Sequence, residues 1–424
     1  MTATLIANVA IFDGSGAAPF PGEVLVEGNR ITKVAQGAER IEANGATRVD
    51  GGGGTLMPGL IDAHAHLGFG SAVDRVLKAH GQTPEQMLLI TAHTAKVMLD
   101  HGFTGAYSGG SHSAAAETAL RDEIAAGWLP GPRLRACSFE REAYVPAEGA
   151  GRKYISFEQR PPDIEGARAF VKEMADIGVD SVKFVVTGDN GIVPNTSLVV
   201  LYHDAELRAA SREAGEAGVW LTAHAHSADA IKMVLRNDFR VIYHCTWPDD
   251  EAIDMLEARK DQVFVAPTVG LNWTNIHADP AYAKRDDGAA LREQMGKLDH
   301  LRELMPALHK RGIRLLPGGD YGFPTNPIGR NAHDIELFVT HLGFTPAEAL
   351  RAATKLGGEI MGMADELGLI APGYLADLLL IDGDPLADIR LLQDTDRLLM
   401  IMKDGKYHKP PRPRRPQAEG ATLS

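Results

Sequence analysis

The chain has 424 residues, 44% of them hydrophobic, and a formal net charge of −13 from 43 basic and 56 acidic residues. A chain of this size can bury a large core, and its length suits one large barrel with a small companion domain. The acidic balance disfavours a nucleic-acid or anionic-membrane surface. Only two cysteines are present, and no apolar run suits a membrane span or a secretion signal, so we expect a cytoplasmic protein unless a leader was removed.

The two ends of the chain have the same β-like character. Short β-branched runs separated by Gly, Pro and Asn begin the chain, at residues 5–11, 23–27, 30–34 and 46–49. Similar runs return at residues 376–381 and 398–405. We therefore predict one β-sandwich domain built from residues 1–55 and 363–408. The Pro- and Arg-rich residues 409–424 favour neither helix nor strand, which predicts a disordered tail.

The middle of the chain, residues 56–362, alternates apolar strand-like runs with amphipathic helical stretches, as in repeated β/α units around a parallel sheet. Eight strand-like runs can be counted, at residues 56–63, 103–107, 133–138, 181–186, 220–223, 240–243, 262–266 and 313–317. The predicted helices include residues 84–100, 164–177, 204–217, 227–236, 249–258, 288–310 and 346–354. This pattern predicts an α/β fold with a (β/α)8 barrel.

Histidines and an aspartate follow four of these runs. The candidates after the first, fifth, sixth and eighth runs are His64, His66, His224, His226, His244 and Asp320. Side chains two positions apart on a strand share a face, so each closely spaced histidine pair can point into one cavity. Barrel active sites lie at the carboxyl ends of the strands, where all six would meet. The pattern favours a metal site, although a single strand histidine is more often a hydrogen-bonded core residue.

Lys183 lies inside the apolar fourth run. A buried ammonium is costly when unpaired, so this lysine must find an anion, lose its proton or be modified. It could pair with a carboxylate, or it could take up CO₂ as a carbamate whose oxygens bridge two metal ions. The sequence pattern does not distinguish these alternatives.

Residues 57–66, Met-Pro-Gly-Leu-Ile-Asp-Ala-His-Ala-His, resemble the first-strand motif of the amidohydrolase superfamily, and residues 368–381 resemble that superfamily's return into its β-sandwich. The resemblance implies two Zn²⁺ ions, other divalent metals being possible, and a hydroxide between them as nucleophile. It implies these ligands: His64, His66 and Asp320 for the first ion, His224 and His244 for the second, and a carboxylated Lys183 bridging both. Asp320 would also be the catalytic acid and base.

Residues 223–226 and 243–246 are similar to the imidazolonepropionase-like and Xaa-Pro dipeptidase branch, which includes ochratoxin-degrading amidases. The resemblance implies an amidohydrolase or peptidase that releases a C-terminal amino acid from a Xaa-Pro dipeptide or an N-acyl aromatic amino acid. Hydrolysis of a cyclic amide or lactone is an alternative. A non-catalytic binding barrel is another, against which the full ligand set argues. We expect a homo-oligomer with a small-molecule substrate and neither nucleic-acid nor membrane partners.

Substrate-binding residues are predicted by position. His226 shares a face with His224, so it would either contact the substrate or orient a ligand. The segment 141–154 is rich in basic and Tyr side chains, which suit a substrate carboxylate but also an ordinary solvated loop. The candidates from this segment and from the segments after the seventh and eighth runs are Arg141, Tyr144, Asn272, Trp273, Phe323 and Arg330.

Overall fold

A computed structural model describes residues 3–77, 82–146, 152–189, 193, 195–277 and 288–414, with no description of the side chains of residues 144–146, 152 and 288–294. Contacts divide the chain into two units. The first comprises Met1–Ile61, Leu99–Thr104 and Thr345–Ser424, and the second comprises Asp62–Met98 and Gly105–Phe344. The barrel unit therefore ends at Phe344, earlier than residue 362.

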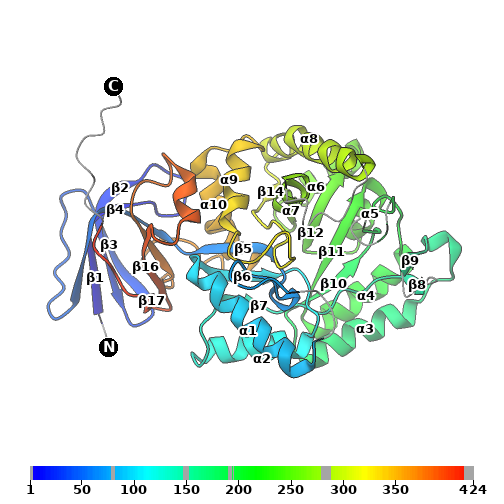
Figure 1. Ribbon diagram of the computed structural model, residues 1–424, viewed down its shortest axis with the longest axis horizontal. Helices are drawn as coiled ribbons and strands as arrows, with labels where there is room; N and C mark the ends of the chain where they lie inside the picture. The colour runs from blue at the N-terminus through cyan, green and yellow to red at the C-terminus, as the bar shows by residue number, and fades with distance from the viewer. Residues whose placement is uncertain are drawn as a thin grey trace. The chain divides into compact units, whose positions relative to one another are not determined.

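The first unit contains one seven-stranded mixed sheet made from both ends of the chain (Figure 1). In pairing order its strands are β17 (Lys406–Lys409), β16 (Leu398–Lys403), β15 (Leu378–Ile381), β4 (Thr47–Pro58), β1 (Ala3–Ile11), β2 (Phe20–Glu27) and β3 (Arg30–Gln36). β4 pairs parallel with β1 and antiparallel with β15, so it joins the N-terminal strands to the C-terminal ones. The predicted joining of the two ends is thus confirmed.

Apolar side chains hold this sheet together. Val, Ile and Leu alternate along its strands, and the cluster they form includes Ile6, Val24, Leu56 and Leu380, none more than 1% exposed. The same unit contains α10 (Pro346–Ala353), α11 (Lys355–Ile360) and the short helix η4 (Ile389–Gln393).

Part of the predicted disordered tail is ordered. Lys409 ends β17, and Nε of Arg414 lies 2.7 Å from Oδ1 of Asp382, so residues 409–414 are fixed to the first unit. The carboxylate that binds Arg414 is itself buried, because Asp382 is 4% exposed. Residues 415–424 of the predicted tail lie outside the described residues.

The second unit is built around a parallel barrel. Its strands are β5 (Leu60–Ala65), β6 (Phe103–Ser108), β7 (Arg133–Arg135), β10 (Ser181–Val185), β11 (Trp220–Ser227), β12 (Val241–Trp247), β13 (Phe264–Ala266) and β14 (Arg314–Leu315). They form sheets in the order β5-β6-β7 and β10-β11-β12-β13-β14. Parallel bridges from Cys137 to Ser181 and from Ala65 to Tyr321 connect the sheets at both junctions, which closes the barrel as predicted.

Helices follow the strands and cover the barrel, as the neighbouring pair α3 and α4 shows (Figure 1). They are α1 (Pro84–Asp100), α2 (Ala114–Ala125), α3 (Ile164–Ile177), α4 (Asp204–Ala217), α5 (Ala228–Arg236), α6 (Asp250–Ala258), α7 (Val269–His277), α8 (Gly288–Lys310) and α9 (Ala332–Thr340). The short helices are η1 (Leu67–Phe69) and η3 (Phe157–Gln159), and a hairpin joins β8 (Tyr144–Pro146) to β9 (Arg152–Tyr154).

Local sequence sets the starts of several of these helices. Asp163, Ser227 and Asp249 each accept a hydrogen bond from a backbone N–H in the first turn of the helix that follows, so each strand-to-helix connection ends at a defined residue. Across the described parts of the chain, no helix combines the length and apolar character needed to cross a bilayer.

Candidate metal centre

All the candidate histidines lie at the carboxyl ends of barrel strands. They are His64 on β5, His66 just after it, His224 and His226 on β11, and His244 on β12. Each of these side chains, and that of Asp320 after β14, is buried. Burial of so many polar groups in one place requires partners for them.

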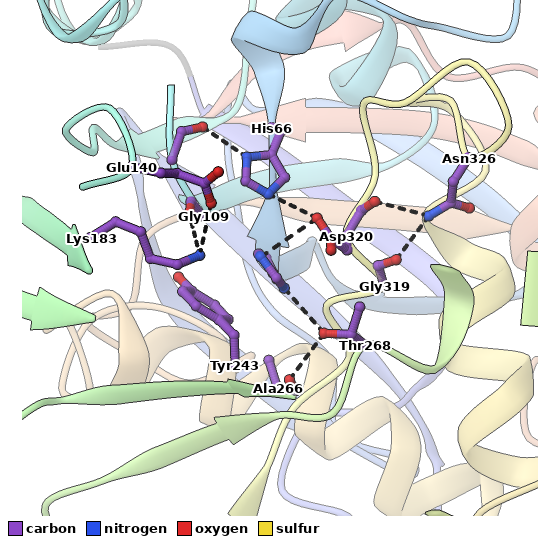
Figure 2. A network of polar contacts seen from close by, with 12 residues as sticks. His66, Gly109, Glu140, Lys183, Tyr243, Ala266, Thr268, Gly319, Asp320 and Asn326 are labelled. Carbon is purple, nitrogen blue, oxygen red and sulfur yellow. Dashed lines mark hydrogen bonds and ion pairs between the residues drawn. The ribbon is translucent and has the colours of Figure 1, made fainter. Parts of the chain in front are cut away.

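His64, His66 and Asp320 form the first buried triad. Nε2 of His66 lies 2.8 Å from Oδ1 of Asp320, and Nε2 of His64 lies 3.6 Å from the same oxygen. The other ring nitrogens have partners, since Nδ1 of His66 is 2.9 Å from the carbonyl oxygen of Gly110 and Nδ1 of His64 is 3.3 Å from Oγ1 of Thr268. Figure 2 shows Nε2 of His66 facing the carboxylate of Asp320, and the distances place Nε2 of His64 near the same oxygen.

The donor atoms of this triad fit a cation. Nδ1 of His66 faces a carbonyl oxygen and must donate to it, so a neutral His66 presents its Nε2 lone pair to the carboxylate oxygen. Burial lowers the pKa of His66, but the hydrogen bond to Asp320 and its charge outweigh burial and raise it, so either a proton or a metal cation has to lie between the two groups. Nε2 of His64 is buried without a hydrogen bond among the described residues. Burial, and secondarily Lys183, lowers the pKa of His64 well below its usual value, which keeps its ring neutral and able to bind metal.

His224, His226 and His244 form the second buried triad, with candidate ligand atoms within 4.8 Å of one another. Register between β11 and β12 shifts after Ala225, and His244 and Cys245 have φ values of 71° and 49°. This bulge turns His244 toward His224, with ring centroids 4.2 Å apart. Burial lowers the pKa of all three histidines, so neutral imidazoles line this site as well.

His226 belongs to this second triad, beyond the two histidines that the resemblance implied. Its Nδ1 lies 2.7 Å from Oγ1 of Thr246, and its ring stacks on that of His244 with centroids 4.5 Å apart. The hydroxyl holds the ring so that its second nitrogen remains available to a ligand.

Lys183 lies between the two triads and is 1% exposed. Its Nζ is 2.7 Å from the carbonyl oxygen of Gly109, 3.3 Å from Oε1 of Glu140 and 4.0 Å from the ring centroid of Tyr243 (Figure 2). Position 109 has to be glycine, because a Cβ there would collide with the ring of His64. The pairing carboxylate considered from the sequence is thus present, as Glu140.

One pocket of about 330 Å³ is open to both triads. Besides five of the six triad residues and Lys183, the lining contains Glu140, Glu142, Tyr154, Val185, Asp189 and Phe323. Two buried, mainly neutral histidine clusters and a carboxylate at the floor of one cavity can hold a pair of divalent ions.

A model of the amidohydrolase family matches residues 55–407, which is most of the chain. The chain belongs to the amidohydrolase family. It is 23% identical to Aspergillus niger ochratoxinase over 381 residues, or 84% of this chain and 76% of that one. The superfamily resemblance inferred from the motifs is confirmed.

Solved structures have the same fold. A Bifidobacterium longum protein classed provisionally as a prolidase superposes with a TM-score of 0.81 and 26% identity, covering 98% of this amidohydrolase and 96% of that chain. A Xaa-Pro dipeptidase with methionine bound in its active site superposes with a TM-score of 0.81 and 24% identity, covering 96% and 100% of the two chains.

The substrate-binding candidates are distributed unevenly. Phe323 lines the pocket of the amidohydrolase, whereas Arg141, Trp273 and Arg330 are not part of its lining. Trp273 stacks on His277 with ring centroids 4.2 Å apart, and Arg330 is exposed. The side chain of Tyr144 lies outside the described part.

Arg141 contacts a helix cap instead of the pocket. Its guanidinium donates to Oδ2 of Asp163 at 3.1 Å and lies 5.2 Å from the ring centroid of Phe170. The predicted carboxylate-binding arginine therefore stabilises the start of α3.

Beneath the pocket lies a group of buried carboxylates that the sequence analysis missed. Oδ1 of Asp62 accepts the backbone N–H of His64 at 2.7 Å, and Oδ2 accepts Nδ2 of Asn331 at 2.7 Å. Asp334 accepts the backbone N–H groups of Gly270 and Gly318 at 2.7 and 2.8 Å. Burial raises the pKa of Asp62 to about 6 and that of Asp334 to about 7.

Glu140 and Glu142 were also missed, although they directly follow the third strand-like run. Their position after a strand end was the available signal, because other site residues stand at equivalent positions.

Proposed function

We propose that this amidohydrolase is a binuclear zinc enzyme that cleaves an amide bond to release a C-terminal amino acid, from a Xaa-Pro dipeptide or an N-acyl aromatic amino acid. The observation that supports it is the convergence of the two triads on one pocket, where Nε2 of both His64 and His66 faces Oδ1 of Asp320 and Nε2 of His64 is buried without a hydrogen bond among the described residues. Hydrolysis of a Xaa-Pro amide agrees with the dipeptidase fold and with the similarity to ochratoxinase.

The first triad would hold one ion, and His224 and His244, with His226 in reach, would hold the other. A carbamate on Lys183, as the resemblance implies, would add an oxygen ligand to each. Bound there, the ions would supply Lewis acidity toward the carbonyl and hydroxide at neutral pH.

Asp320 is placed to move the proton. Its Oδ1 faces the pocket within 3.6 Å of both Nε2 atoms of the first triad, and its backbone carbonyl is fixed by Nδ2 of Asn326 at 3.0 Å. Its φ of 63° is a conformation that non-glycine residues rarely adopt, which marks a position held for function. Asp320 would take the proton of the attacking water and deliver it to the leaving nitrogen.

The lining of the pocket also bears on the substrate. Aromatic contact from Phe323 suits a prolyl ring or an aromatic side chain.

The test is release of free amino acid from a panel of Xaa-Pro dipeptides and N-acyl aromatic amino acids, with zinc-loaded and chelator-stripped protein compared directly. We expect release only from the metal-loaded protein, and its loss in His64→Ala. No release from any member of the panel by protein holding two zinc ions would contradict the proposal and favour a cyclic amide or lactone.

A further inference from the structure

If the proposed function holds, the charged side chains that line the pocket determine which substrates the enzyme prefers. The only cationic side chain among its described lining residues is Lys183, which already contacts Glu140. The nearby guanidinium of Arg141 is turned to Asp163. Among the described lining residues, therefore, no arginine faces an anionic part of the substrate.

Two further carboxylates belong to this wall. Glu142 follows β7, and Asp189 follows β10, the strand that carries Lys183, so the two carboxylates stand after neighbouring strands. Both are half-buried and line the same cavity as the metal-binding triads.

The chemistry of a dipeptide matches this arrangement. In a Xaa-Pro dipeptide the free α-ammonium nitrogen is separated from the scissile carbonyl carbon by a single Cα atom. Any protein group that binds the ammonium must therefore lie in the cavity that receives the carbonyl. A carboxylate in a partly water-excluded wall forms strong charge-assisted hydrogen bonds with such an ammonium. An N-acyl group offers no positive charge there.

We infer that Glu142 and Asp189 bind the free α-ammonium group of the substrate, so that the enzyme selects dipeptides with an unblocked N-terminus over N-acyl amino acids. The two residues are specificity determinants, and Asp320 and the histidines would act alike on both classes of amide.

The experiment compares alanyl-proline with propionyl-proline, which has hydrogen in place of the amino group and is otherwise the same. For the zinc-loaded enzyme we expect kcat/KM for alanyl-proline to be at least about tenfold higher. Glu142→Gln and Asp189→Asn should each lower kcat/KM for alanyl-proline about tenfold and leave propionyl-proline nearly unchanged. Glu158→Gln, an exposed carboxamide variant outside the pocket lining, should behave as the wild-type enzyme does.

A pH profile adds a second readout. The advantage of alanyl-proline should fall as the pH rises past about 8, because an α-amino group loses its proton near there. Equal rates for both substrates, or equal losses on both in the two variants, would overturn this inference while leaving the amidase proposal intact. Hydrolysis of neither substrate would overturn the proposed function as well.

Discussion

Two groups of buried polar side chains in the barrel unit differ in where their partners come from. Beneath the pocket, Asp62 accepts a hydrogen bond from Asn331, and Asp62 and Asp334 accept others from backbone N–H groups. In the pocket, Nε2 of His64 has no hydrogen bond among the described residues, and Oδ1 of Asp320 faces the Nε2 atoms of His64 and His66. Since burial without a partner is costly, the lower group is built to position the chain and the upper group to bind a ligand. Removing a residue from each group should therefore have different consequences.

Loss of Asp320 should have the largest effect. Asp320→Ala removes both a ligand atom and the proton-transfer group, and we expect kcat to fall by about 10²–10⁴-fold or more. Zinc content should fall from two ions toward one, measured by elemental analysis after gel filtration. The chelated protein should also unfold at a somewhat lower temperature, because the variant loses the buried contact of 2.8 Å between Oδ1 and Nε2 of His66. A kcat near that of the wild-type enzyme would show that Asp320 takes no part in the reaction.

Loss of Asn331 should weaken metal binding indirectly, because Asn331 holds the carboxylate of Asp62 that fixes the backbone of His64. Asn331→Ala leaves Oδ2 of Asp62 buried without its donor, which loosens the carboxylate that fixes the backbone of His64. We expect zinc affinity to fall about 10–100-fold and stability to fall by about 1–3 kcal/mol. Competition with a chromophoric chelator measures the affinity.

Asn237 provides the matched control. It is buried too, and its Nδ2 donates to Asp204 and to the carbonyl of Met233, away from the pocket. Asn237→Ala should lower the melting temperature by a similar amount and leave zinc affinity unchanged. If both variants lower the affinity for zinc equally, the positioning role assigned to Asn331 is wrong.

Asp334 should make stability depend on pH. Burial, aided by the charge of Asp62, raises its pKa from 3.8 to about 7. Between these values the folded protein keeps a proton that the unfolded chain has released, so this group's contribution to stability declines as the pH rises through that window, by up to about 1.4 kcal/mol per pH unit. Asp334→Asn should be less stable at pH 5, having lost one acceptor, but should show a flatter decline toward pH 7.

The measurement is the free energy of unfolding of chelated protein at several pH values, taken as the difference between wild-type and variant. Subtraction is needed because the buried histidines, whose pKa values are lowered, contribute an opposite dependence. A constant difference across this range would show that Asp334 titrates normally.

The sequence predicted the upper group better than the lower group for a physical reason. Strand periodicity places His64 beside His66, and the carboxyl ends of parallel strands meet, so local pattern predicted both pairs of histidines and Asp320. The hydrogen bond from Asn331 to Asp62 joins residues 269 positions apart and depends on barrel closure. The bulge that turns His244 inward likewise arises from pairing between strands.

The charge composition of segment 141–154 did not predict which side chains reach the pocket. The basic segment 141–154 suggested a carboxylate-binding site, yet the backbone after β7 directs Glu140 and Glu142 to the pocket and Arg141 away from it. Adjacent residues on an extended chain point in opposite directions, so the composition of a segment does not say which charges enter a site.

Arg141 therefore gives the smallest predicted effect. Its ion pair with Asp163 is partly exposed, with side-chain exposures of 21% and 60%, and such pairs contribute at most about 1 kcal/mol. Arg141→Ala should lower stability by no more than that and leave KM for a Xaa-Pro dipeptide within about twofold of wild-type, which corresponds to a fraction of a kcal/mol. A tenfold rise in KM would mean that the guanidinium leaves Asp163 for the substrate carboxylate, and the segment would then be a carboxylate-binding lid as its composition suggests.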